Sequence, residues 1–151
     1  KKVEKLKGDF ANIRLLNNPR KITPCALNIG IKNSHGKYII RLDAHAKYNN
    51  GYIDETIKFL DQSDSDVMNV GGVIDTVRGK DNLISKSIAI VLSSKFGVGD
   101  SLFRTQSPDR NISVDTVPFG GFKKEVFDKV GLFDENEPRN EDLELNYRIN
   151  I

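Results

Sequence analysis

One short stretch, residues 38–46, restricts the fold of this chain more than any other. It reads Tyr-Ile-Ile-Arg-Leu-Asp-Ala-His-Ala, so an apolar run ends in an acid, Asp43, and an imidazole, His45. The pattern predicts a buried strand that delivers polar groups to the carboxyl edge of a sheet, where open α/β folds bind ligands. Residues two apart on extended chain point the same way. We therefore expect Asp43 and His45 to face one ion or one phosphate together.

Before and after this stretch, strand patterns alternate with helical patterns. The strand patterns are rich in β-branched residues, and the helical patterns repeat apolar residues every three or four positions. Together they predict an α/β fold with a mostly parallel sheet and helices on both faces. The expected strands cover residues 10–17, 37–42, 67–77 and 114–119, and the expected helices begin at Thr23, Ile53, Asp81, Lys123 and Asn140.

The composition excludes several classes of protein. A formal net charge of +2 over 151 residues is too small to indicate a nucleic-acid partner. The single cysteine, Cys25, excludes an internal disulfide and a zinc site built from several cysteines. No stretch of the sequence reaches the roughly 18 apolar residues that a membrane span needs. We expect one globular domain, or a large part of one.

The Asp43-Ala44-His45 tripeptide is the strongest candidate for a metal site. An acid and an imidazole at this spacing suit a borderline divalent ion, Mn²⁺ or a relative, that also holds phosphate oxygens. The structural alternative is that Asp43 caps the following turn while His45 packs against the sheet edge. A hydrolytic zinc or iron centre would need more ligands, and the other histidine, His35, is expected at the opposite end of the strand.

Two further acids, Glu141 and Asp142, fall in the first turn of the last expected helix. Unpaired amides and the helix dipole stabilise negative charge there, which explains the pair without any function. The functional alternative is that one of the two is a general base. A carboxylate that stays ionised at this position can accept a proton from a hydroxyl nucleophile within hydrogen-bond reach.

The glycine-rich and basic segments are less specific. Neither residues 97–99 nor Gly120-Gly121 match a P-loop or the dinucleotide-binding fingerprint. Arg104 and Arg110 lie in an irregular stretch, residues 96–111, and could pair with a diphosphate through two hydrogen bonds each. The alternative is that both arginines are simply solvated.

Several motifs follow one another in a defined order and cover nearly the whole chain. They are residues 26–30 (ALNIG), 36–45 (GKYIIRLDAH), 96–99 (FGVG), 114–120 (VDTVPFG), 130–135 (VGLFDE) and 139–148 (RNEDLELNYR). In this order and spacing they resemble the family 2 glycosyltransferases of the GT-A fold. Within that family the resemblance is greatest to the branch that builds bacterial exopolysaccharides such as succinoglycan.

The resemblance implies a UDP- or GDP-sugar donor, a divalent cation (Mn²⁺ or Mg²⁺) and inversion at the anomeric carbon. Asp43 and His45 fall on the first and third positions of the family's Asp-x-Asp motif, which grips the donor diphosphate with the metal. Asp142 falls on the second acid of the family's Glu-Asp pair, the base that deprotonates the acceptor hydroxyl, and Glu141 would assist it. The acceptor would be a hydroxyl of a glycan or of a lipid-linked sugar.

The resemblance also implies positions for further binding residues. Asp43, Arg41, Asn28 and Arg104 are expected to contact the donor. The floor of the donor-sugar and acceptor site is expected at Phe119, Gly120 and Gly121, and residues 96–110 are expected to form a mobile flap over it.

The chain departs from the family pattern in two ways. His45 replaces an acid, which makes the diphosphate site less negative. The family's first strand, with its nucleotide-binding acid, is expected before Lys1, and further motifs of the family are expected after the last helix. We therefore expect residues 1–151 to be a partial GT-A domain that is poorly active alone. The full-length protein is expected in the cytoplasm, with association at the inner face of the membrane.

Two other functions are compatible with the residues. A nucleotidyltransferase would also present acids to a metal and phosphates, but it needs a basic triphosphate loop that the sequence does not show. A non-catalytic domain that binds carbohydrate or nucleotide sugar would bind the donor without turnover, and its binding would tolerate the loss of Asp142.

Overall fold

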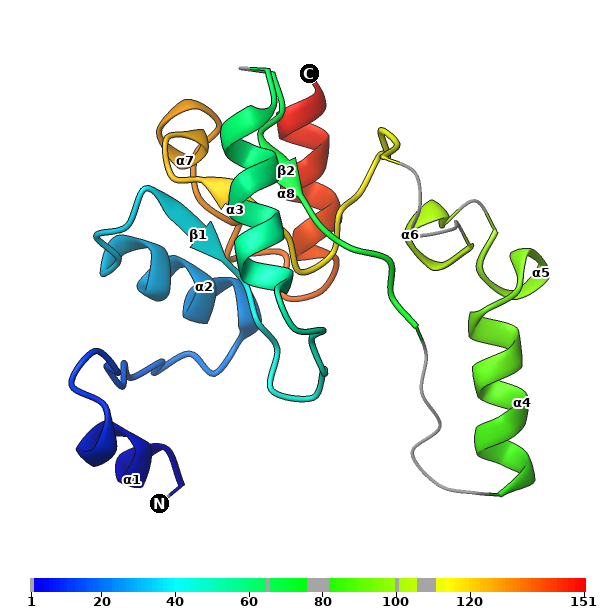
Figure 1. The fold of residues 1–151 in the computed structure, drawn as a ribbon, viewed down its shortest axis with the longest axis horizontal. Helices are drawn as coiled ribbons and strands as arrows, with labels where there is room; N and C mark the ends of the chain where they lie inside the picture. The colour runs from blue at the N-terminus through cyan, green and yellow to red at the C-terminus, as the bar shows by residue number, and fades with distance from the viewer. Residues whose placement is uncertain (1, 65, 76–81, 100, 106–110) are drawn as a thin grey trace.

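The computed structural model of the chain describes residues 2–64, 66–75, 82–99, 101–105 and 111–151. In these residues helices and short strands alternate, and Figure 1 shows their arrangement. The strands are β1 (Tyr38–Ile40), β2 (Asn69–Val70) and β3 (Gly121–Lys123). The helices are α1 (Lys2–Asp9), α2 (Thr23–Lys32), α3 (Tyr52–Gln62), α4 (Leu83–Leu92), α5 (Lys95–Val98), α6 (Leu102–Thr105), α7 (Val126–Lys129) and α8 (Glu141–Asn150).

The described strands form one three-stranded sheet with β3 in the middle. β1 and β2 both pair antiparallel with β3, so that Phe122 lies opposite Ile39 on one side and Asn69 on the other. β1 and β2 therefore run parallel to each other. The expected mixture of helices and strands is present, but a mostly parallel sheet is not confirmed, because the strand between β1 and β2 runs the other way.

The strand expected at residues 114–119 is not formed, and β3 begins two residues later, at Gly121. A β-carbon on Gly121 would lie 2.4 Å from the Thr56 Cγ2 atom of α3. Helix α3 thus packs directly on the strand backbone, which requires glycine at this place. Gly121, just beyond the end of the expected strand, therefore provides the first residue of the central strand.

The other strand predictions met different outcomes. Residues 10–17 contain no strand, and the strand expected at 67–77 is reduced to Asn69–Val70, with residues 76 and 77 outside the described part. The central strand expected at 37–42 is confirmed as β1, although it ends at Ile40. These are the shortest elements of the fold, and their limits depend on long-range pairing that a local pattern does not contain.

Helices cover both faces of the sheet, as expected. Successive residues of a strand point to opposite faces, so Gly121 faces α3 while Phe122 faces the main core. Figure 1 shows α3 in front of the sheet. The core on the other face is built from Ile31, Phe122, Phe127, Phe133 and Leu145, which come from α2, β3, α7, the following loop and α8.

Helix α4 begins where the sequence predicted a helix, with a different capping residue. Its N-cap is Asn82, whose side chain accepts a hydrogen bond from the Ser85 backbone N–H at 2.8 Å. Asp81, the predicted cap, lies outside the described residues. An asparagine oxygen satisfies one of the otherwise unpaired amides of the first turn.

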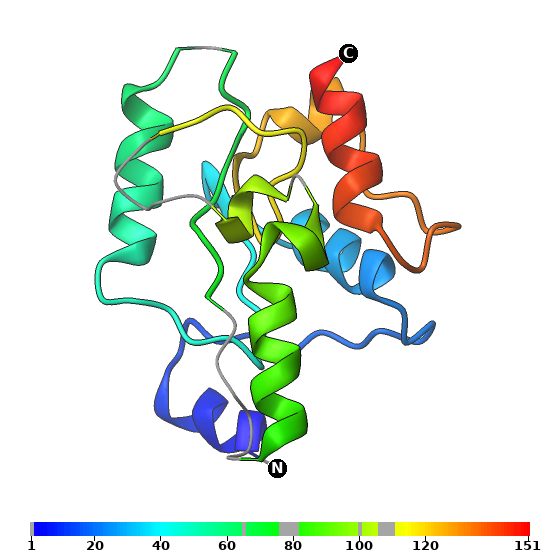
Figure 2. The same cartoon turned by 90° about the vertical axis from the view of Figure 1, so that its right-hand side faces the viewer.

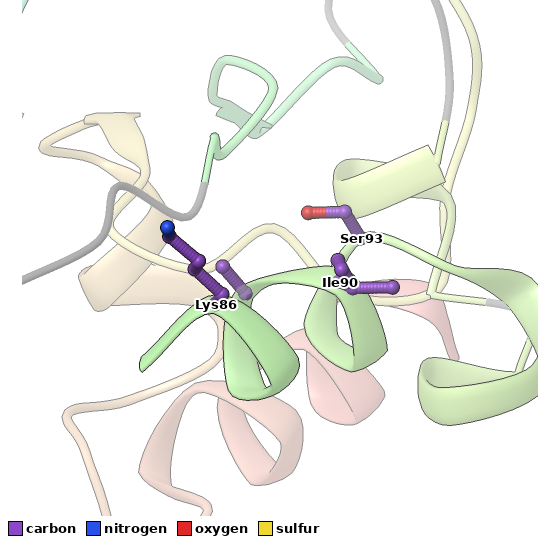
Figure 3. A pocket seen from close by; sticks show the side chains of 4 residues that line it. Lys86, Ile90 and Ser93 are labelled. Atoms are coloured by element: carbon purple, nitrogen blue, oxygen red, sulfur yellow. The ribbon is translucent and has the colours of Figure 1, made fainter. Parts of the chain in front are cut away.

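Helix α4 stands apart from the sheet in Figure 1 and faces the viewer in Figure 2. Leu83, Ile84 and Ile90 on this helix are 70–80% exposed. A shallow hollow of about 390 Å³ lies against it, lined by Lys86, Ala89, Ile90 and Ser93, and Figure 3 shows these side chains. In the part of the chain that the structure describes, no helix has the length and apolar character needed to cross a membrane.

Candidate active site

The candidate site forms around one guanidinium, that of Arg41, directly after β1. Arg41 Nε donates a hydrogen bond to Asp43 Oδ1 at 3.0 Å, and its Nη1 donates to Asp142 Oδ1 at 2.8 Å and to Glu141 Oε1 at 3.2 Å. The Arg41 side chain is only 9% exposed. The structure thus brings the acid after β1 together with the two acids of α8, which lie about 100 positions further along the chain.

The turn after β1 positions Asp43. The Arg41 backbone N–H donates to the Gly120 carbonyl at 3.2 Å, which continues the β1–β3 pairing by one residue. The Asp43 backbone N–H then donates to the Tyr48 hydroxyl oxygen at 2.7 Å. Tyr48 was not among the residues expected at the site. The only available signal was an aromatic hydroxyl a few residues after the acid, in a segment without periodicity.

The start of α8 positions Glu141 and Asp142. The N-cap residue is Asn140, as expected, but its side chain makes no capping hydrogen bond, and its φ of 61° is left-handed. Asparagine tolerates this region better than most residues. The backbone turn at Asn140, rather than a side-chain cap, therefore directs the first turn of α8 toward Arg41.

The electrostatics of the site act most strongly on Asp142. Burial raises the pKa of the Asp142 carboxyl to about 6; the Arg41 guanidinium opposes this shift, and the negative charge of Glu141 adds to it. For Arg41, burial lowers the pKa, but the hydrogen bond to Asp43 and the charge of Asp142 outweigh burial, so its pKa is raised. A carboxyl group that titrates near neutral pH is suited to exchange a proton with a substrate hydroxyl.

Phe119 contacts both halves of the site. Its ring lies 4.9 Å from the Arg41 guanidinium carbon and meets the His45 ring edge-on at a centroid distance of 6.4 Å. Its φ of 54° is left-handed, which is unusual for a residue with a side chain. Such backbone strain is concentrated at functional sites. Phe119 therefore lies against both Arg41 and His45, and its role as the floor of the site stays a prediction.

The two glycines after Phe119 have different surroundings. A β-carbon on Gly120 would lie 1.9 Å from Asn69 Oδ1, so β2 contacts the backbone at this position. Gly121 is buried beneath α3, where Thr56 occupies the space beside it. Gly120 is thus covered by Asn69 of β2, whereas Gly121 lies in the interior of the sheet beneath α3.

A pair of side-chain amides, Asn69 and Asn146, supports the first turn of α8 at Asp142. Asn69 Nδ2 donates to Asn146 Oδ1 at 2.9 Å, and Asn146 Nδ2 donates to the Asp142 carbonyl at 2.7 Å and to the Val117 carbonyl at 3.4 Å. Asn146 is 4% exposed. Neither amide was predicted to act at the site. The signal for Asn146 was a polar residue at a buried position of α8, one turn after Asp142.

Asn28, expected to bind the donor, has another role in this structure. Its Nδ2 donates to the Phe133 carbonyl at 2.9 Å and to Glu135 Oε1 at 3.0 Å, while its Oδ1 accepts from the Phe133 N–H at 3.0 Å. The residue is 3% exposed. Its amide therefore connects α2 to the loop before α8. It makes no contact with Arg41 or the three acids among the hydrogen bonds of the described residues.

This contact predicts a loss of stability for Asn28→Ala. The substitution leaves the buried N–H and carbonyl of Phe133 without partners, and we expect the free energy of unfolding to fall by about 1–3 kcal/mol. Urea unfolding followed by circular dichroism measures it, with Asn50→Ala at an exposed turn as the control. An unchanged urea midpoint for Asn28→Ala would contradict the structural role of this amide.

The remaining predicted residues lie in or near exposed segments. His45 is exposed beside Phe119. Arg104 lies in α6, within the predicted flap; residue 100 and residues 106–110, which include Arg110, fall outside the described part of the chain. The closing of a flap over the site stays a prediction.

The acids of the site fit a divalent cation only when a ligand supplies further oxygens. Within the described ranges, no group of three or more His, Cys, Asp or Glu side chains is placed to hold an ion. Asp43 and His45 would offer two ligands, and Mg²⁺ and related ions are commonly held by one or two carboxylates together with substrate phosphates. Three acids around one guanidinium also leave an excess of negative charge for a cation to offset.

Comparison with known proteins identifies the class of this chain. The family model described as "Glycosyl transferase family 2" matches residues 1–131. The chain therefore belongs to glycosyl transferase family 2, a family that implies the GT-A fold. This confirms the family that the ordered motifs resembled.

Two curated relatives match the chain over nearly its whole length. The succinoglycan biosynthesis protein ExoA of Rhizobium meliloti (strain 1021) is 28% identical over 147 residues, which are 96% of this chain and 43% of that protein. The dolichyl N-acetyl-alpha-D-glucosaminyl phosphate 3-beta-D-2,3-diacetamido-2,3-dideoxy-beta-D-glucuronosyltransferase of Methanococcus voltae is 25% identical over 147 residues, 95% of this chain and 44% of that protein. The chain thus spans less than half the length of either relative. No solved structure matches it significantly.

Proposed function

We propose that this domain belongs to an inverting glycosyltransferase that moves a sugar from a UDP- or GDP-sugar to a hydroxyl of a glycan or lipid-linked acceptor. The observation that carries the proposal is the group formed by Arg41, Asp43 and Asp142 at the end of β1, with the pKa of Asp142 near neutral pH. Family membership supports the reaction class. The names of the two relatives, one for succinoglycan biosynthesis and one for a glucuronosyltransferase, support a glycan or lipid-linked acceptor.

In this proposal each acid has one task. The Asp142 carboxylate accepts the proton of the acceptor hydroxyl as the hydroxyl oxygen attacks the anomeric carbon and the bond to the diphosphate breaks. Glu141, beside it on α8, keeps negative charge near the incoming hydroxyl proton. Attack from the side opposite the diphosphate inverts the anomeric carbon.

Asp43 and His45 are the residues that would hold the divalent cation, Mn²⁺ or Mg²⁺. When bound, the cation would offset the charge that builds on the leaving diphosphate. The aromatic face of Phe119 would pack against the sugar or the acceptor. A cytoplasmic location and membrane association of the full-length protein stay predictions.

Calorimetric titration of UDP and GDP into the full-length protein, with Mn²⁺ and then with EDTA, tests this proposal. We expect one of the two nucleotides to bind, and EDTA to weaken its binding by about tenfold or more because the ion links the acid to the diphosphate. Transfer from the matching nucleotide sugar should follow the same metal dependence. Absence of binding and of transfer for both nucleotides would contradict the proposal.

Asp43→Asn is the variant that assigns the metal-binding acid. We expect it to remove most of the difference between titrations with Mn²⁺ and with EDTA, because a neutral amide is a much poorer ligand for a hard cation. Asp64→Asn, at an exposed acid after α3, is the matched control and should bind the nucleotide as the wild type does. If Asp43→Asn kept the full metal dependence, Asp43 would not be the metal ligand.

A further inference from the structure

We propose that Arg41 is a positioning residue that sets the direction of the base Asp142 from the strand side of the site, and does not serve mainly to bind the donor. The inference rests on the proposed function, because it assigns Asp142 as base. It changes the expectation from the family resemblance, which placed Arg41 among the donor-binding residues.

The guanidinium nitrogens of Arg41 contact two separate parts of the chain. Nε is directed to Asp43, two residues along the chain, while Nη1 is directed across the site to α8. One planar group thus connects a loop after β1 with the first turn of a helix about 100 residues away. A lysine ammonium is a single point charge on a flexible stem and cannot hold the two directions at a fixed angle.

Arg41 also balances the negative charge of the three acids of the site. In the part of the chain that the structure describes, the ion pairs of Asp43, Glu141 and Asp142 are all made with Arg41. All four side chains are less than 20% exposed, so solvent screens their interactions less than it does at the surface. Loss of the guanidinium therefore leaves the acids of α8 to repel each other, and their side chains would turn away from the site.

The side chain of Arg41 is itself held in one position. The Phe119 ring packs against the guanidinium at 4.9 Å. The Arg41 backbone is paired with Gly120, next to Phe119. The guanidinium is thus held by the strand, by Asp43 and by an aromatic face, which makes it a rigid support for the carboxylate of Asp142.

Steady-state kinetics of Arg41→Lys separates positioning from donor binding. The assay follows release of UDP or GDP by the full-length protein from UDP-glucose, UDP-N-acetylglucosamine or GDP-mannose, whichever the wild type uses. We expect kcat to fall by about tenfold to a hundredfold while the KM for the donor changes by less than about threefold, because misplacing a catalytic group affects the chemical step. Arg20→Lys, at an exposed Arg–Glu pair, is the matched control and should keep both constants.

Chemical rescue provides a second readout. Arg41→Ala leaves a space in which free guanidinium can bind between the acids, so adding guanidinium at non-denaturing concentration should raise its kcat by about fivefold or more, whereas methylammonium should not. A donor KM that rises tenfold at unchanged kcat in Arg41→Lys, or equal rescue by both cations, would overturn the positioning role.

A third readout needs no activity. In ¹⁵N spectra of the donor-free protein, the Arg41 Nε proton should exchange slowly with water, and Asp142→Asn should speed its exchange by about fivefold or more although Nε contacts Asp43 and not Asp142. Asp54→Asn should leave it unchanged. Unchanged exchange in Asp142→Asn would overturn the coupling through Arg41. If instead the wild-type protein transferred no sugar while this coupling was observed, the proposed function would fail and the coupling would stand.

Discussion

Asp142→Asn is expected to reduce the rate of sugar transfer by the full-length protein by about 10²- to 10⁴-fold, the usual contribution of a general base. Asparagine has nearly the same size, so the fold of α8 should survive, although loss of the charge weakens the contact with Arg41. Its amide cannot take the proton of the acceptor hydroxyl. The affinity for the nucleotide should stay within about threefold of the wild type, because the loss concerns the chemical step alone.

Initial rates with saturating donor, together with calorimetric binding of the nucleotide, measure both halves of this prediction. The matched control is Asp54→Asn, which changes an exposed acid in the first turn of α3 and should leave both quantities unchanged. A full-length Asp142→Asn protein that transfers sugar at the wild-type rate would rule Asp142 out as the base.

The pKa of Asp142 makes a separate prediction about pH. Transfer should decline as the pH falls below about 6, where the carboxyl group becomes protonated.

The stability of the fold should depend on pH in the opposite direction. The pKa of Asp142 in the folded state lies above the value of 3.8 for an exposed acid, so folding favours the protonated form. That contribution is complete below pH 3.8 and is lost as the pH rises through about 6. Asp142→Asn should therefore raise the unfolding midpoint in urea more at pH 8 than at pH 4, and an equal shift at both would contradict the assigned pKa.

Phe122→Ala is expected to have the largest effect on stability. Phe122 is 2% exposed at the centre of β3, where it packs in the core formed with Ile31, Phe127, Phe133 and Leu145. Truncation removes the ring and leaves a cavity that the surrounding helices fill only in part, which costs about 3–5 kcal/mol. That loss approaches the whole stability of many domains of this size.

Urea unfolding measures the effect, with Phe96→Ala as a matched control. Phe96 is fully exposed, so the same change of residue there should alter the free energy of unfolding by less than about 0.5 kcal/mol. If the two variants lost similar stability, the ring of Phe122 would not be the centre of the core.

The sequence predicted the acids of the site better than the contacts that support them. Asp43 and Asp142 could be paired from local patterns because each ends or begins an element with a clear periodicity, and because their motifs occur in a recognisable order. In the structure Arg41 joins them, a contact that the sequence did not predict. The expected placement of acids at the end of β1 and the start of α8 therefore needed only local patterns and motif order.

Other features depend on contacts that no local pattern records. The direction of β3 follows from its insertion between two strands, and its position is shifted because Gly121, and not the β-branched run before it, fits beneath α3. Asn28 lies in a motif that resembles the donor-binding residues of the family, yet its side-chain amide hydrogen-bonds to the backbone of Phe133. Asn69 contacts Asn146 of α8 from a strand of two residues, which is too short to be specified by periodicity.

The central place of β3 in the sheet has a consequence for synthesis of the chain on the ribosome. β1 and β2 find their partner only when Gly121 and its neighbours have emerged. Roughly 80 residues separate the end of β1 from β3, and at about 5–20 residues per second their translation takes about 4–16 s. From the synthesis of β2 until β3 emerges, both nascent strands present unpaired edges, which are prone to join other chains. Products of premature termination before Gly121 should therefore aggregate, whereas chains released after α8 can bury both edges.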